Sequence, residues 1–124
     1  MHLERDEVAA AAEVVGQAVR RARAVTYRRG LVEALWVQAM VATRQGRWED
    51  AECSLAEGLA LARSMADPYV EARLLHVYGT MLATKGQPVP ARQRLGEALA
   101  MLRRLGARKA AAQVERSIAA LAHQ

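Results

Sequence analysis

The sequence predicts an all-α protein of about six helices, paired as antiparallel hairpins within a single domain of residues 1–124. Only 4% of the residues are aromatic and none is Phe, whereas 27 are Ala and 14 are Leu, so strong helix formers outnumber the residues typical of strands. The 52% apolar fraction is too high for a disordered chain. Glycines also recur after stretches whose apolar residues have helical spacing.

Glycine and proline mark where the helices end and begin. Glycine adopts a left-handed C-cap without steric cost, and four glycines follow apolar-periodic stretches: Gly30, Gly46, Gly86 and Gly106. Asp67 followed by Pro68 supplies an N-cap carboxylate and a proline at the first helical position. The predicted helices span residues 4–27, 31–45, 48–65, 68–85, 88–105 and 107–122.

The apolar spacing inside these segments supports the division. Residues recur at i, i+4 and i+7 in the third and last predicted helices, as Leu55, Leu59 and Ala62 and as Val114, Ile118 and Leu121. Connections of about two to five residues force neighbouring helices to run antiparallel. We expect hairpins at residues 4–45, 48–85 and 88–122, the last of them including a capping helix.

The sequence matches itself at an offset of 40 residues. Residues 35–51 align with residues 75–91, so that Gly46 lies over Gly86. The same offset aligns Leu55, Gly58 and Leu59 with Leu95, Ala98 and Leu99, and places Val15, Ala18 and Val19 under them. The N-terminal helix therefore resembles the second member of a hairpin.

In these repeats the chain resembles a tetratricopeptide repeat (TPR) protein. The second repeat matches the family signature at Leu75, Tyr78, Gly79, Leu82, Ala91, Leu95 and Ala98. The first matches it at Leu35, Ala39, Ala51, Leu55 and Gly58, and departs from it at Gln38 and Ala42. The small residues Ala39, Gly79, Ala51 and Ala91 would let paired helices approach closely.

The period is longer than the usual repeat of about 34 residues, and both repeats lack the closing proline. Long periods of this kind are similar to the helical arrays of large multidomain bacterial signalling ATPases and transcription regulators. The resemblance implies a short right-handed solenoid of stacked hairpins, with the first helix of each pair on its concave side.

The resemblance places candidate partner-binding residues on that concave side: Trp36, Met40, Arg44, Arg73, His76 and Thr80, with Glu33, Thr43 and Thr84 on the same exposed surface. Trp36 and Met40 lie one turn apart and could anchor a partner helix or peptide. The cationic and titratable residues among them favour an acidic or amphipathic ligand. In the alternative interpretation, Trp36 packs between hairpins as a core residue. The positions of the family's carboxylate clamp hold no Lys or Asn, so recognition of chaperone tails is not expected.

The net charge of +5 raises the question of nucleic-acid binding. The densest basic cluster lies between Arg20 and Arg29, at the end of a predicted helix that begins with acidic residues, which is the arrangement that complements the helix dipole. No recognition helix with base-reaching side chains is evident. We therefore interpret these arginines as solvated surface and expect no nucleic-acid partner.

The sequence offers no convergent catalytic groups, metal-ligand spacing or phosphate-binding glycine loop, so we expect neither an enzyme nor a cofactor nor a metal site. The single cysteine, Cys53, excludes an internal disulfide and is interpreted as a small core residue. No apolar run approaches the ~20 residues of a membrane span, and the N-terminus does not resemble a signal peptide. We expect a cytoplasmic protein without a membrane partner.

The first predicted helix carries apolar residues on more than one side, including Val14, Val15 and Val19. This breadth predicts that another copy or a neighbouring domain covers it, so we expect a homo-oligomer that forms through the N-terminal helix. The predicted function is a non-enzymatic scaffold that binds a peptide or helix of another protein, or of its own parent protein, in the concave groove. The alternative is a small-ligand or peptide sensor module of a bacterial transcription regulator.

Overall fold

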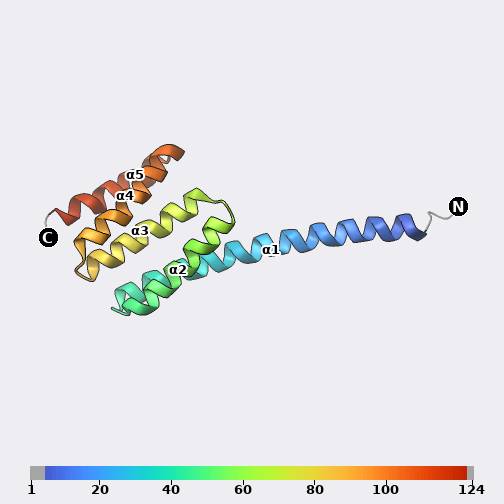
Figure 1. Cartoon of the computed structure of the whole chain (residues 1–124), viewed down its shortest axis with the longest axis horizontal. Helices are drawn as coiled ribbons and strands as arrows, with labels where there is room; N and C mark the ends of the chain where they lie inside the picture. Colours follow the sequence, from blue (N-terminus) through green and yellow to red (C-terminus); the bar gives the residue numbers. More distant parts are fainter. Residues whose placement is uncertain (1–4, 123–124) are drawn as a thin grey trace. The chain divides into compact units, whose positions relative to one another are not determined.

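The computed structural model describes residues 5–122 and contains five helices and no strand within that range. The all-α prediction is therefore confirmed for these residues. Figure 1 shows the helices in chain order. They are α1 (Arg5–Arg44), α2 (Trp48–Ser64), α3 (Pro68–Thr84), α4 (Pro88–Leu105) and α5 (Arg108–Leu121).

The prediction of six helices was wrong for the described residues, because one helix replaces the first two. This helix is α1 (Arg5–Arg44), which passes through Gly30 without ending. The 40-residue offset shows why α1 has no break. The turns after α2 and α4 each contain a residue with a positive φ, Ala66 (51°) and Gly106 (71°). The equivalent residue in α1 is Thr26, and a β-branched residue is strongly disfavoured at positive φ. The helix therefore continues where the other two helices of this type end.

The chain divides into two units, residues 1–31 and residues 32–124. The described part of the first unit is the N-terminal part of α1, which is rich in alanine and arginine. From residue 9 onward nearly all of its side chains are exposed, and Val14, Val15 and Tyr27 are among the large exposed side chains.

The second unit holds the hydrophobic core. The C-terminal part of α1, residues 32–44, belongs to this unit together with α2 to α5. Within it α3 packs against α2 and α4, and α4 packs against α5, so successive helices lie side by side (Figure 1). The largest fully buried side chains come from four helices and are Leu55, Leu74, Leu75, Met81, Leu95, Leu102 and Val114.

The other predicted helix boundaries are confirmed within about two residues. The Asp67 carboxylate accepts a hydrogen bond from the Val70 amide at 3.2 Å, and Pro68 opens α3, as an N-cap followed by proline predicts. Gly46, Gly86 and Gly106 have φ of 72°, 88° and 71° and lie in the turns after α1, α3 and α4. No described helix is both long enough and apolar enough to cross a bilayer.

The small residues of the repeat lie where helices approach most closely, as predicted. Ala39, Ala51 and Ala91 are completely buried. A Cβ atom added to Gly79 in α3 would lie 2.5 Å from Cγ of Leu95 and 3.2 Å from the Ala91 carbonyl oxygen, both in α4. Glycine therefore allows the backbones of α3 and α4 to approach, and the buried Leu95 side chain fills the space over it.

We expect Gly79→Ala to lower the free energy of unfolding by about 1–3 kcal/mol, because the new methyl group overpacks a site whose neighbours cannot withdraw. Gly96→Ala is the matched control. Gly96 also lies within a helix but has open space around its Cβ position, so its replacement is expected to raise the free energy by about 0.5–1 kcal/mol. Urea denaturation measures both changes, and equal effects of the two substitutions would contradict the close approach.

Candidate functional site

The first helices of the repeats line a cavity of about 400 Å³. We call it the α1–α3 cavity; its lining residues are Trp36, Met40, Thr43, Arg44, His76, Val77, Thr80, Thr84 and Gln113. Five of the six predicted partner-binding residues are in this set: Trp36, Met40, Arg44, His76 and Thr80. The structure therefore brings together residues that lie up to 44 positions apart in the sequence, although their role in binding remains a prediction.

Arg73, the sixth predicted residue, lies beside the α1–α3 cavity and not in its lining. Its guanidinium group stacks on the Trp36 ring at 4.5 Å from the ring centre and pairs with a Glu33 carboxylate oxygen at 3.5 Å. It lines a smaller neighbouring cavity of about 250 Å³, whose lining also includes Trp36 and His76. Arg73 thus fixes the orientation of the indole ring by a cation–π contact.

Trp36 is half-buried, so it is neither a fully buried core residue nor a fully exposed residue of the groove. Its ring packs against the hydrophobic core, yet one part of it lines the α1–α3 cavity. The indole Nε1 is buried and has no hydrogen-bond partner among the described residues. A buried donor without an acceptor is costly, so this N–H is an unsatisfied polar group within the folded unit.

His76 is held by α5. Its Nε2 lies 2.9 Å from the Ser117 hydroxyl oxygen, and that hydroxyl donates to the Gln113 carbonyl at 3.2 Å. Because the hydroxyl has one hydrogen, this pattern assigns His76 the tautomer in which Nε2–H donates to Ser117. Burial lowers the pKa of His76 below its usual value of 6.5 by desolvating the charged form. His76 is therefore neutral at pH 7.

The threonine hydroxyls of the cavity are already engaged as donors. Thr43, Thr80 and Thr84 each donate to the carbonyl four residues earlier, at 2.7, 3.0 and 2.9 Å. Thr43 was predicted to be exposed but is only 8% exposed, because it lies under the turn that connects α1 to α2. These hydroxyl oxygens remain available as acceptors for ligand N–H groups.

The charge of the α1–α3 cavity is positive. Arg44 lines it from the last turn of α1, whereas none of the lining residues is acidic. With His76 neutral, a permanent cation, the indole ring of Trp36 and the apolar side chains of Met40 and Val77 line the same space. This combination suits a ligand that has both an acidic or carbonyl group and an apolar group.

The sequence analysis missed the contribution of α5. Gln113 lines the α1–α3 cavity, and Ser117 orients His76. The 40-residue offset could have indicated both residues, since it carries Arg73 onto Gln113 and Val77 onto Ser117. We interpreted the last helix only as a cap, and so did not extend the repeat that far.

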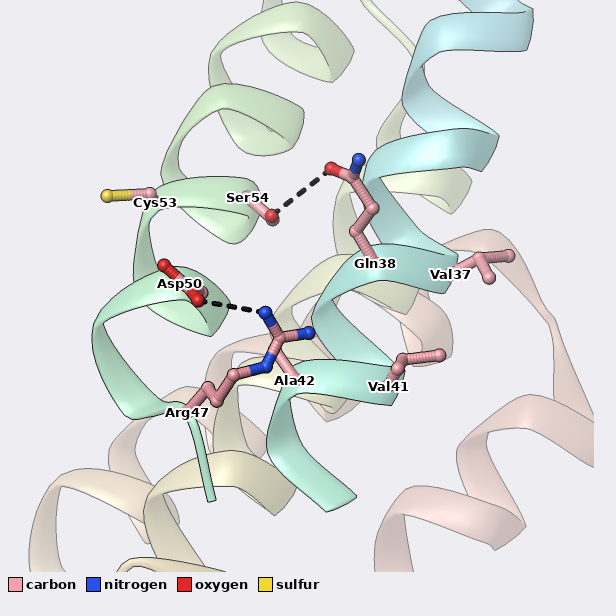
Figure 2. Close-up of a pocket in the computed structure, with 8 residues that line it drawn as sticks. All are labelled: Val37, Gln38, Val41, Ala42, Arg47, Asp50, Cys53 and Ser54. Carbon is pink, nitrogen blue, oxygen red and sulfur yellow. Dashed lines mark hydrogen bonds and ion pairs between the residues drawn. The ribbon is translucent and has the colours of Figure 1, made fainter. Parts of the chain in front are cut away.

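Cys53 is exposed, so the prediction that it belongs to the core was wrong. The buried residues of α2 lie on the side that carries Ala51, Leu55 and Leu59, and Cys53 points to the opposite side of the helix (Figure 2). Among the described residues no group of three or more His, Cys, Asp or Glu side chains could hold a metal ion.

A second cavity of about 420 Å³ lies on the α1–α2 side. Its lining residues are Val37, Gln38, Val41, Ala42, Arg47, Asp50, Cys53 and Ser54 (Figure 2). Arg47 pairs with Asp50 at 3.1 Å, and the Ser54 hydroxyl donates to the Gln38 side-chain oxygen at 3.5 Å. Val37 and Val41 are exposed here, although both are apolar.

Comparison with known proteins gives one informative match. No protein-family profile matches the chain, and no solved structure is significantly similar to it. The regulatory protein RapG of Bacillus subtilis (strain 168) is 34% identical over 84 residues, which are 67% of this chain. The chain spans only 23% of the length of RapG, so the similarity concerns a part of that protein.

The free energy of unfolding is expected to fall as the pH drops below about 6.5, because the unfolded chain then binds a proton at His76 more readily than the folded chain does. Above that pH the residue is neutral in both states, so its contribution is constant. The control variant His76→Gln should lose this part of the pH dependence. Urea denaturation between about pH 5 and pH 8 measures it, and identical profiles for the two proteins would contradict the lowered pKa.

Proposed function

We propose that the chain is a non-enzymatic, TPR-type helical array that binds a peptide or helix of a protein partner in the α1–α3 cavity. The observation that carries the proposal is the convergence of Trp36, Met40, Arg44 and His76 on one cavity that contains no acidic side chain. The similarity to RapG supports a regulatory role, since RapG is named a regulatory protein. A bacterial, cytoplasmic setting belongs to the same proposal.

The ligand that fits this cavity is an amphipathic segment with an acidic group. An apolar side chain of the ligand would lie against Met40 and Val77, while a carboxylate would pair with Arg44. Neutral His76 adds no competing charge, and in the assigned tautomer its other ring nitrogen, Nδ1, is an acceptor.

A small-ligand sensor is the second candidate, and the size of the cavity favours it. A volume of about 400 Å³ lies within the range typical of small-molecule sites, about 300–1,000 Å³. In this alternative the chain would be the sensor module of a bacterial transcription regulator. A thermal-shift screen with metabolites and with short acidic peptides distinguishes the two ligand classes.

The binding proposal is tested with peptides selected from a random library displayed on phage. Selected sequences are expected to combine acidic and large apolar residues. Arg44→Glu is expected to weaken their binding at least about tenfold, because it replaces the cation of the cavity by a like charge. Arg104→Ala, on the exposed end of α4, is the control and should leave the affinity unchanged. Equal affinities of the Arg44→Glu and wild-type proteins would contradict the proposed site.

Trp36 itself can report the binding. The chain has two tryptophans, so a Trp48→Phe variant leaves Trp36 as the single indole. We expect its fluorescence to change when a selected peptide binds, because the ring lines the cavity and the peptide would change its surroundings. A peptide that binds this variant tightly without any change in Trp36 emission would place the binding site elsewhere.

A further inference from the structure

Two apolar surfaces are exposed that the repeat buries elsewhere in the chain. The first is on α1 before Thr26, and we call it the segment face: Ala11, Val15, Ala18, Val19 and Ala22. All five residues are exposed, Val15 by 62% and Val19 by 42%. Their counterparts 40 residues later in α2 are Ala51, Leu55, Gly58, Leu59 and Ala62, and all five are buried.

The second surface is on α1 after Gly30, and we call it the flank face: Ala34, Val37, Gln38 and Val41. All four residues are exposed, and Figure 2 shows Val37 and Val41 projecting away from α2. Their counterparts in α3 are Leu74, Val77, Tyr78 and Met81, of which Leu74 and Met81 are buried and the other two half-buried. At each of these positions, therefore, the side chain of α3 is buried or half-buried, whereas the equivalent side chain of α1 is exposed.

The contact between α2 and α3 shows how such faces fit together. A Cβ atom at Gly58 of α2 would lie 3.3 Å from a methyl group of Leu74 in α3. Farther along the same pair of helices, Arg63 pairs with Glu71 at 3.1 Å. In the 40-residue register the counterpart of the contact between Gly58 and Leu74 joins Ala18 to Ala34. Ala18 of the segment face and Ala34 of the flank face thus hold the positions that meet where α2 packs on α3.

The two faces lie on the same helix, α1, which has no turn between them. A hairpin that would bring them together needs a turn at residue 26, where Thr26 stands in helical conformation. A second copy of the chain carries both faces and satisfies both of them at once.

We propose that residues 9–27 of one copy pack antiparallel on residues 34–41 of a second copy, repeating the contact of α2 with α3. Each copy then contributes one segment face and one flank face, so the two contacts are related by a two-fold axis and the dimer is closed. The two copies thereby exchange residues 9–27, because α1 lacks the turn at Thr26 that would let these residues fold back on their own chain. The exchange is independent of ligand binding in the α1–α3 cavity.

A pair of cysteines tests the register directly. Ala18→Cys and Ala34→Cys are combined in a Cys53→Ser background, and the full chain is oxidised and run on a denaturing gel without reductant. A covalent dimer supports the proposal, because the thiol introduced at position 18 of one copy then lies beside the thiol introduced at position 34 of the other. A monomer that contains an internal disulfide would overturn it, since the chain would have folded back on itself. A monomer with two free thiols would also overturn it.

The matched control moves one cysteine off the segment face. Ala24 has the exposed residues Ser64 and Arg104 as its counterparts, so Ala24→Cys combined with Ala34→Cys is expected to give no covalent dimer. An equal yield of covalent dimer from this control would show that collision produced the disulfide, and it would overturn the proposed register.

The mass in solution gives a second test that needs no cysteine. Val19→Asp on the segment face and Val41→Asp on the flank face should each weaken the dimer at least about tenfold, measured by analytical ultracentrifugation. The controls are Val14→Asp, whose counterparts are Ser54 and Arg94, and Val89→Asp, whose counterpart is Glu49; both should leave the dimer intact. A wild-type chain that is monomeric up to millimolar concentration would overturn the proposal.

Discussion

The close approach of paired helices at small residues is the constraint on which the folded unit depends. Gly79 lets the backbone of α3 lie so near α4 that Leu95 and the Ala91 carbonyl occupy the space of a Cβ atom. Ala39 and Ala51 hold the equivalent positions one repeat earlier and are completely buried. Leu95 fills the space over Gly79, and its counterpart Leu55 one repeat earlier is fully buried as well.

That packing also creates the candidate site. Because the second helices bury their leucines against the first helices, the remaining sides of α1 and α3 face a common space. Arg73, beside this space, stacks on Trp36 at 4.5 Å from the ring centre, and α5 contributes Gln113 and the hydroxyl that orients His76. The stacking that stabilises the core therefore also fixes the geometry and the positive charge of the α1–α3 cavity.

A single position explains why the first repeat differs from the others. Ala66 and Gly106 adopt the positive φ that ends α2 and α4, whereas Thr26 continues α1. The apolar pattern of a second helix is still present before that position, so it has no hairpin partner within its own helix. The part of α1 before Thr26 has the apolar face of a second helix but lacks the turn that ends α2 and α4. The proposed exchange between copies rests on this combination.

The sequence by itself determined the helical class and the positions of α2 to α5, because periodic apolar residues, Asp67-Pro68 and the glycine turns act over short distances. Most of the residues that line the α1–α3 cavity were predicted from the resemblance to TPR proteins. The sequence also indicated a break at Gly30 that does not occur, since a glycine is tolerated inside a helix whose neighbours favour it. The solvent-facing side of Cys53, the half-burial of Trp36 and the role of Ser117 were decided only in the tertiary structure. Those properties depend on which helix packs over each residue. A contact between residues about 40 positions apart, such as His76 and Ser117, cannot be predicted from the residues that adjoin either one in the sequence.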